Sequence, residues 1–305
     1  QGSRGLNALL ATASTSNSSQ IIVGQRLRKG STSAARGADK LVSDTLATTK
    51  RFNPGAAVLV RVDSAYYSSS VTKAVQDAGA NVSITVRMDK KVKAAIATIT
   101  DDAWTGIAYP DAIYDEETGA WIARGEVAEV PFTAFTSKKK ALQVTGRLVV
   151  RRILELNETK RAAGQDPLFD LFRYHAFFTT LDQDHFDTVV ADQVHRRHTV
   201  IAQINAELKN GALGHMPSGV FNANAAWVTI AALTHNLLRA AAGVVGGRTS
   251  KVRAQTLRMR IIDVPARVAH RARKLILHLL KKWPWVQEFS RLWQAVLGPP
   301  RPVVA

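Results

Sequence analysis

The segment AAVLVRVD, residues 56–63, constrains the fold more than any other, because an apolar run ends abruptly in a carboxylate. Its length and branched apolar residues predict a buried strand. Residues 69–78 have helical spacing, Gly79 closes that helix, and residues 81–88 (NVSITVRM) predict a second strand. A strand–helix–strand unit of this kind favours an α/β fold. Open α/β sheets bind ligands at the carboxyl ends of their strands, which is where Asp63 is expected.

Two elements are predicted ahead of this unit. Residues 19–31 (SQIIVGQRLRKGS) predict a short strand from the β-branched run 21–23, with the basic residues up to Gly30 leading into a loop. Residues 33–52 have the spacing of a helix, and the Asn-Pro-Gly run 53–55 predicts a turn. The chain opens on QGSRGLNALLATAST, with neither Met nor a signal pattern. We therefore expect a fragment that starts inside a domain.

The rest of the chain is predicted to be first β-rich and then helical. Between residues 103 and 180, the pieces WIARGEVAEVPFTAFT, QVTGRLVVRRILEL and FRYHAFFTTL are β-rich and separated by polar turns. Residues 188–210 predict one long helix, which the Asn210-Gly211 pair ends. A further helix is expected from residue 222 to about residue 242, followed by a Gly- and Ser-containing break.

The charge balance indicates which partners to consider. The chain has 41 Lys and Arg against 24 Asp and Glu, a formal net charge of +17. Such an excess favours polyanions, with nucleic acid ahead of an anionic membrane surface. The chain has no cysteine, which excludes disulfides, thiolate metal sites and a cysteine nucleophile. The longest apolar stretch, residues 225–247, is interrupted by His235, Asn236 and Arg239 and predicts a buried core helix rather than a membrane span.

Asp63 has two interpretations at this point. A carboxylate at the end of a strand is a hard oxygen ligand that suits Mg²⁺. The same side chain can simply cap the helix that follows, and spacing favours neither interpretation. His175 and His235 stand in apolar surroundings and are expected to be core histidines rather than ligands. The acidic cluster 115–117 is expected to be a turn.

The stretch HRRHTVIAQINAELKNG, residues 195–211, combines four basic side chains with a helical run. Together with RGLNALLAT, QRLRKGS, VRVDSAYY, ITVRMD, AEVPFTAF, RYHAFFT and IIDVPARVAHRARKLILHL, it resembles the DDE-class transposases of bacterial insertion sequences. The resemblance is closest to insertion-sequence family thirteen-eighty. These segments follow one another in the expected order and span almost the whole chain.

The resemblance implies an α/β fold with an RNase H-like core, a β-rich insertion and a basic C-terminal extension. It implies three carboxylates that hold two Mg²⁺ or Mn²⁺ ions, which cleave a phosphodiester and transfer the strand by in-line attack. Asp63 matches the second aspartate, as a catalytic residue and metal ligand. The first aspartate is expected on a strand upstream of RGLNALLAT, before this sequence starts.

The third carboxylate belongs to a signature of Tyr, two residues, Arg, three residues, Glu, six residues and Lys. Lys209 matches its Lys, while Ala202 falls at the Glu position, His198 at the Arg position and His195 at the Tyr position. On one continuous helix these four would lie roughly along one side. Glu207 is a weak alternative, because five residues place it roughly 140° around the helix from Ala202. The departure at Ala202 predicts impaired catalysis.

The resemblance also implies partners and a location. DNA, as insertion-sequence ends and target, is the expected partner, contacted by Arg196, Arg197, His198 and Lys209, although such residues also suit a solvated helix face. A homodimer in the synaptic complex, no membrane association and a bacterial cytoplasmic, nucleoid-associated location are expected. The alternative from another functional class is a non-catalytic DNA-binding remnant or a repurposed transposase-derived protein.

Four regions follow from this interpretation. Residues 1–95 would form the first part of the RNase H-like core, and residues 96–187 the β-rich insertion. Residues 188–247 would supply the last catalytic helix and the helical part of the core. Residues 248–305 would form the basic C-terminal region, where eleven Lys or Arg face two acids between residues 251 and 291.

Overall fold

The strand–helix–strand unit predicted before and after Asp63 is present. β3 (Leu59–Val62) and β4 (Asn81–Thr85) pair in parallel, and α2 (Ser69–Asp77) connects them. Gly79 takes the left-handed φ of 64° that lets the chain leave α2 and turn into β4. The mixed α/β class and the position of Asp63 at the carboxyl end of β3 are therefore confirmed.

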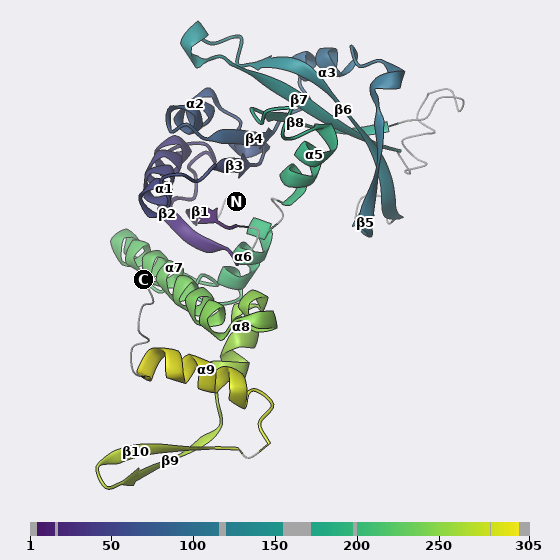
Figure 1. Cartoon of the computed structure of the whole chain (residues 1–305). Helices are drawn as coiled ribbons and strands as arrows, with labels where there is room; N and C mark the ends of the chain where they lie inside the picture. Colours follow the sequence, from purple (N-terminus) through teal and green to yellow (C-terminus); the bar gives the residue numbers. More distant parts are fainter. Residues whose placement is uncertain are drawn as a thin grey trace. The chain divides into compact units, whose positions relative to one another are not determined.

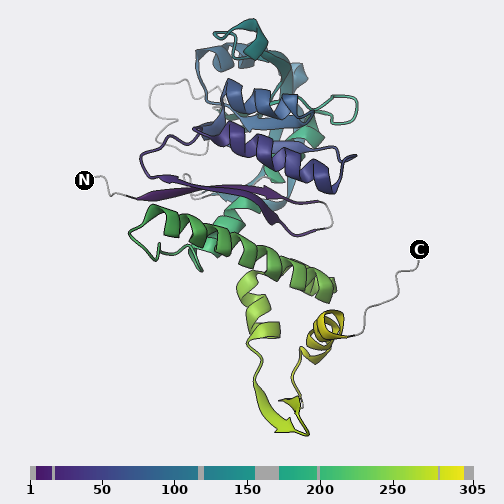
Figure 2. The same ribbon diagram turned by 90° about the vertical axis from the view of Figure 1, so that its left-hand side faces the viewer.

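The computed structural model describes residues 5–15, 18–115, 120–154, 172–197, 200–280 and 282–298. The chain forms two units, which are residues 32–199 and residues 1–31 together with 200–305. Figures 1 and 2 show the elements of both units in two views. The predicted cluster 115–117 lies outside the described residues except for Asp115, which ends a strand.

In the unit of residues 32–199, the β-rich pieces extend the sheet that begins with β3 and β4. They form β5 (Thr105–Asp115), β6 (Ala120–Ala134), β7 (Val144–Leu154) and β8 (Phe172–Thr179). The strand order is β3-β4-β8-β7-β6-β5, and every pair except β3–β4 is antiparallel. The expected insertion thus shares one continuous sheet with the parallel pair (Figure 1).

The core of this unit lies against the middle of the sheet. Phe178, Ile84 and Leu148 are fully buried there, and burying each such side chain contributes roughly 1.5–3 kcal/mol. Gly146 on β7 has to be glycine, because a Cβ atom at that position would collide with the Thr179 carbonyl oxygen and the Phe178 ring. Close packing between β7 and β8 therefore fixes the residue type at this position.

The described residues of this unit also form α1 (Ala38–Phe52), α3 (Lys90–Ile96) and α5 (Thr188–Arg196). The prediction that the first of them begins at residue 33 was wrong, because Gly37 takes a left-handed φ of 75° and the helix starts after it. Asp187 caps α5 by accepting a hydrogen bond from the Val190 N–H.

The other unit contains an antiparallel hairpin of β1 (Leu6–Ala13) and β2 (Ile21–Lys29). The expectation that the basic residues of β2 lead into a loop was wrong. They pair with β1 through Lys29 opposite Leu6, and strand pairing outweighs their low β propensity. α7 (Phe221–Val245) runs along this hairpin in both views (Figures 1 and 2). Asn236 fastens it by bonding both the N–H and the carbonyl of Ile22, each at 2.8 Å.

The same unit holds α6 (Val200–Lys209) and the C-terminal elements. The latter are α8 (Ala254–Leu257), a π-helical turn (Arg258–Ile262), the hairpin of β9 (Ala266–Arg271) and β10 (Lys274–Leu279), and α9 (Val286–Leu297). The basic C-terminal region therefore has regular secondary structure in its described part.

α7 is the one described helix that is long and apolar enough to cross a membrane by length and composition. It buries polar side chains, among them Asn224, His235 and Arg239, against its own unit. Only one side of α7 is buried, and Ile230, Leu233 and Leu237 are exposed, so the prediction of a buried core helix holds for that side alone.

Candidate functional site

Asp63 follows β3 directly and its side chain is exposed. One carboxylate oxygen, Oδ1, accepts a hydrogen bond of 2.8 Å from the Ala65 N–H, which caps the 3₁₀ turn Ser64–Tyr66. A carboxylate offers about four lone-pair sites, so this cap leaves most of its acceptor capacity free. Capping and ligand binding, the two interpretations of Asp63, are therefore compatible in one side chain.

A metal site requires more than this one carboxylate. Among the described residues, no group of three or more His, Asp or Glu side chains is placed to hold a metal ion. Two divalent ions in a DDE arrangement need several carboxylate oxygens. The described residues near Asp63 do not by themselves fit such a pair of ions.

Arg61 on β3 and Arg197 at the end of α5 lie close enough to interact electrostatically. Arg61 lies two residues earlier on the extended backbone of β3, so its side chain leaves on the same side as that of Asp63. Its Nη1 atom donates a hydrogen bond of 2.8 Å to the Val194 carbonyl near the end of α5. Burial lowers the pKa of the Arg61 guanidinium, and the positive charge of Arg197 lowers that pKa further. Arg197 is exposed and caps the C-terminus of α5.

His195, at the signature's Tyr position, is attached to the sheet. Its ring stacks on Phe177 with centroids 4.0 Å apart and planes 1° from parallel. Its Nδ1 lies 2.7 Å from the Ser83 hydroxyl and its Nε2 lies 3.2 Å from the Thr85 hydroxyl. These two β4 residues stand on one side of the strand. They fix the imidazole, and with it the end of α5, against the sheet.

Arg196, predicted to contact DNA, bonds a buried acid instead of projecting freely. Its Nε donates a 2.7 Å hydrogen bond to Asp192, which is 1% exposed and also accepts one of 3.1 Å from Arg151. The Arg196 guanidinium also lies over the Tyr109 ring, 4.8 Å from its centroid. One buried carboxylate thus binds two cations and joins α5 to the sheet.

The predicted single helix over residues 188–210 was wrong. The structure has two helices, α5 ending at Arg196 and α6 beginning at Val200, and they belong to different units. The physical reason is tertiary, because the sheet holds the end of α5 whereas α6 packs against a separate core. The four signature positions therefore do not share one helix face. His198 lies outside the described residues.

α6 has an exposed side and a buried side. Ala202 and Lys209 are exposed, whereas Ile204 and Leu208 are buried. Glu207 turns inward, with its side chain 12% exposed and its Oε2 atom 3.9 Å from His235 Nδ1. Glu207 thus faces α7, while Ala202 faces solvent.

His235 is a core histidine, as predicted, and is 5% exposed. Its Nε2 lies 3.2 Å from the Gln20 carbonyl, an acceptor, so Nε2 carries the hydrogen in a neutral ring. Burial lowers the pKa of His235, the Arg239 charge lowers it further, and the Gln20 bond and Glu207 act in the opposite direction. The parallel prediction for His175 was wrong, because its side chain is exposed on β8, although Phe177 and Thr179 further along the same side of the strand are buried.

Three residues with clear structural or electrostatic roles were missed from the sequence. Arg61 could have been found from its two-residue spacing to Asp63. Asp192 stands four residues before Arg196, a spacing that predicts a helical ion pair, although not its burial. The sequence analysis names Arg239 only as an interruption of an apolar stretch. The residues near it in sequence do not predict that its guanidinium is buried.

Comparison with known proteins identifies the family. A family model, described as transposase DDE domain group 1, matches residues 16–298. No curated protein matches the chain. The matched range includes Asp63, α5, α6 and most of the C-terminal region. The chain therefore belongs to the DDE-domain transposases.

Proposed function

We propose that this chain is a DNA transposase in which Asp63 is a metal-binding carboxylate and Ala202 has removed another. The observation that carries the proposal is the exposed carboxylate of Asp63 at the carboxyl end of β3, two residues after the cationic Arg61, whose pKa the charge of Arg197 lowers. A carboxylate beside fixed positive charge suits a site where a phosphodiester meets a divalent cation. The order β-β-α-β-α-β from β1 to β4 supports an RNase H-like core.

Divalent metal would supply the electrophilic chemistry in such a transposase, and this chain's residues would do the rest. Asp63 is free to offer oxygen ligands beyond the Ala65 cap. Arg197 and Lys209 are exposed cations that would contact DNA phosphates. Arg196, being bonded to Asp192, would act by holding α5 in place. Because a methyl group at position 202 cannot bind a metal, we propose that DNA cleavage by this chain is impaired.

The alternative is a DNA-binding protein that has lost its chemistry. It is favoured by two observations, the exposed methyl group at Ala202 and the inward orientation of Glu207 toward His235. In that case Arg197 and Lys209 would still contact DNA. Binding would weaken steeply as salt increases, because released counterions drive it. Binding that is insensitive to salt would contradict both functions.

Restoring the acid tests the catalytic proposal. Ala202→Glu should create Mg²⁺- or Mn²⁺-dependent cleavage of insertion-sequence ends, assayed in the reading frame that includes the expected upstream aspartate. Asp63→Asn in that background should abolish cleavage, and Mn²⁺ binding followed by electron paramagnetic resonance should rise with Ala202→Glu and fall with Asp63→Asn.

Ala206→Glu is the matched control, because Ala206 is also exposed on α6 and lies about one turn away. It should neither cleave DNA nor gain Mn²⁺ affinity. Equal gains from both substitutions, or cleavage by the unaltered chain that Glu207→Gln abolishes, would contradict the role assigned to position 202. Salt-dependent DNA binding with no cleavage in any variant would favour the non-catalytic alternative.

A further inference from the structure

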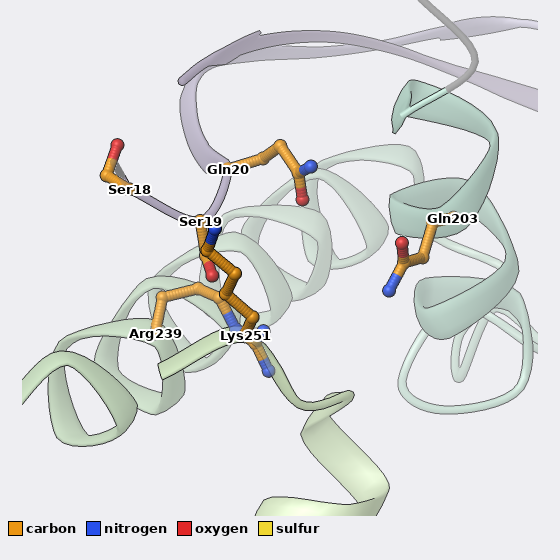
Figure 3. Close-up of a pocket in the computed structure, with 6 residues that line it drawn as sticks. All are labelled: Ser18, Ser19, Gln20, Gln203, Arg239 and Lys251. Carbon is orange, nitrogen blue, oxygen red and sulfur yellow. The ribbon is translucent and has the colours of Figure 1, made fainter. Parts of the chain in front are cut away.

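A pocket of about 250 Å³ lies within the unit formed by residues 1–31 and 200–305. Figure 3 shows the residues that line it: Ser18, Ser19, Gln20, Gln203, Arg239 and Lys251. Since a water molecule occupies roughly 30 Å³ in the liquid, the volume admits a small polyatomic anion with some of its water. Two of the six lining residues are cationic and none is acidic.

Arg239 is the unusual member of this set. It is 7% exposed, and its Nη1 donates a 2.7 Å hydrogen bond to the Val252 carbonyl. Its Nε and Nη2 are buried, and neither has a hydrogen-bond partner among the described residues. No carboxylate of the described residues lies within 4.0 Å of the Arg239 guanidinium, so no ion pair offsets its buried charge either. A guanidinium buried without a counter-charge is costly, so a bound anion would stabilise it.

The structure around Arg239 is fixed, which makes this an organised site. Ser19 donates a 2.6 Å hydrogen bond from its hydroxyl to the Ser250 carbonyl, which joins the start of β2 to the turn that carries Lys251. The His235–Gln20 bond holds the same segment against α7. Gln203 reaches the pocket from α6, and Figure 3 shows it across from Arg239 and Lys251. Four separate parts of the chain, namely the segment before β2, α6, α7 and the turn that carries Lys251, thus line one basic pocket.

We propose that this pocket binds a phosphate group, with Lys251 as the exposed contact and Arg239 as the buried counter-charge. Lys251 is exposed and supplies a mobile ammonium, while the side-chain amides of Gln20 and Gln203 add neutral donors. That a phosphodiester of DNA supplies the group rests on the proposed function. The phosphate would be a backbone contact, separate from the residues assigned to the chemistry, and it would position DNA without reading its sequence.

Inorganic phosphate is the direct probe of the site. Calorimetric titration at constant ionic strength, with chloride as the reference anion, should show saturable binding to the unaltered chain. Lys251→Gln and Arg239→Gln should each weaken phosphate binding about tenfold or more, as expected for a loss of roughly 1.4 kcal/mol or more. Lys93→Gln, an equal charge change at an exposed residue of the other unit, should leave it unchanged. Because Lys251 is exposed, its substitution tests the site even where Arg239→Gln impairs folding.

Duplex DNA distinguishes the source of the phosphate. Lys251→Gln should reduce the slope of log affinity against log salt by about one, the loss of one phosphate contact. An unchanged slope, with phosphate binding lost, would overturn DNA as the source and leave the pocket as a site for a free phosphate ester. Absence of DNA binding by the unaltered chain would overturn the proposed function, while the phosphate titration still decides the site. No phosphate binding beyond chloride, or equal binding by both pocket variants, would overturn the site itself.

Discussion

The two units of the chain differ in whether their buried charged side chains have ion-pair partners. In the unit of residues 32–199, Asp192 is almost fully buried and is bonded by two arginines, Arg151 and Arg196. In the other unit, Arg239 is buried and two of its nitrogen atoms have no hydrogen-bond partner among the described residues, and Glu207 lies 3.9 Å from His235 with no hydrogen bond from those residues to its Oε2. A buried charge with partners stabilises the structure around it, whereas a buried charge without partners is destabilising unless a ligand or a proton neutralises it. We call residues 32–199 the paired unit, and residues 1–31 with 200–305 the unpaired unit.

The largest expected effect is in the paired unit. Asp192→Asn should lower the free energy of unfolding by about 3 kcal/mol, toward the lower end of the cost of removing one partner of a buried pair, because both arginines keep some exposure. Urea denaturation followed by hydrogen exchange in α5 measures it. Asp77→Asn, which removes an exposed ion pair with Lys73, is the control and should cost about 0.5 kcal/mol or less. Equal costs for the two changes would remove the contrast between the units.

A smaller effect, seen as a pH dependence, is expected in the unpaired unit. Burial lowers the pKa of His235 below its ordinary value of 6.5, so the unfolded chain binds a proton at a pH where the folded chain does not. Stability of this unit should therefore fall as pH decreases below about 6.5, until the folded pKa is passed. The groups that face this ring are Glu207, Arg239 and the Gln20 carbonyl.

His235→Gln keeps a side-chain N–H donor and should flatten that acid slope in denaturation curves recorded from pH 7 to 5. His270→Gln, at an exposed histidine of β9, should leave the slope as it is in the unaltered chain. If both variants retain the slope, other groups cause the acid sensitivity and the unpaired cluster does not.

The smallest expected effect is on the stability of the unit of residues 32–199 at alkaline pH. Burial and the negative charge of Asp89 raise the pKa of Tyr67 to about 12, so between the unfolded value near 10 and this pKa the folded state loses stability as pH rises. Tyr67 packs on Phe135 with ring centroids 4.7 Å apart. Ultraviolet titration of tyrosinate should show a group with a pKa of about 12 that Tyr67→Phe removes and Tyr174→Phe retains, while Tyr109, whose pKa burial also raises, still titrates late in both variants. Persistence of the group with a pKa of about 12 in Tyr67→Phe would assign it to another residue.

Much of the fold was accessible from local sequence patterns. The strand ending at Asp63, the helix α2, Gly79 and the strand β4 were predicted because apolar run lengths and a glycine stop reflect backbone geometry directly. The β-rich pieces that became β6, β7 and β8 were predicted for the same reason. The bounds of α1 and the basic half of β2 were missed, since a left-handed Gly37 and pairing with β1 override residue propensities.

The stretch that begins at His195 marks where sequence reasoning failed. A helical pattern runs through residues 188–210 with no Gly or Pro to break it, and the sequence predicts one helix. The structure ends α5 at Arg196, because His195 is stacked on Phe177 and Arg196 is bonded to Asp192. These partners are close in space but mostly distant in sequence, so the helical spacing of residues 188–210 cannot predict them.

By itself the sequence determined the α/β class, the place of Asp63, the absence of an acid at Ala202 and the resemblance to DDE transposases. Each of these depends on residue type and short-range spacing, and both can be read directly from a single sequence. Only the tertiary structure decided which charges are neutralised. Asp192 is bonded by two arginines, Glu207 is turned toward His235, and Arg239 lines a pocket with Lys251 and has two buried nitrogen atoms with no partner in the described part of the chain. Neutralisation depends on distance and burial, and folding sets both among residues that the sequence keeps apart.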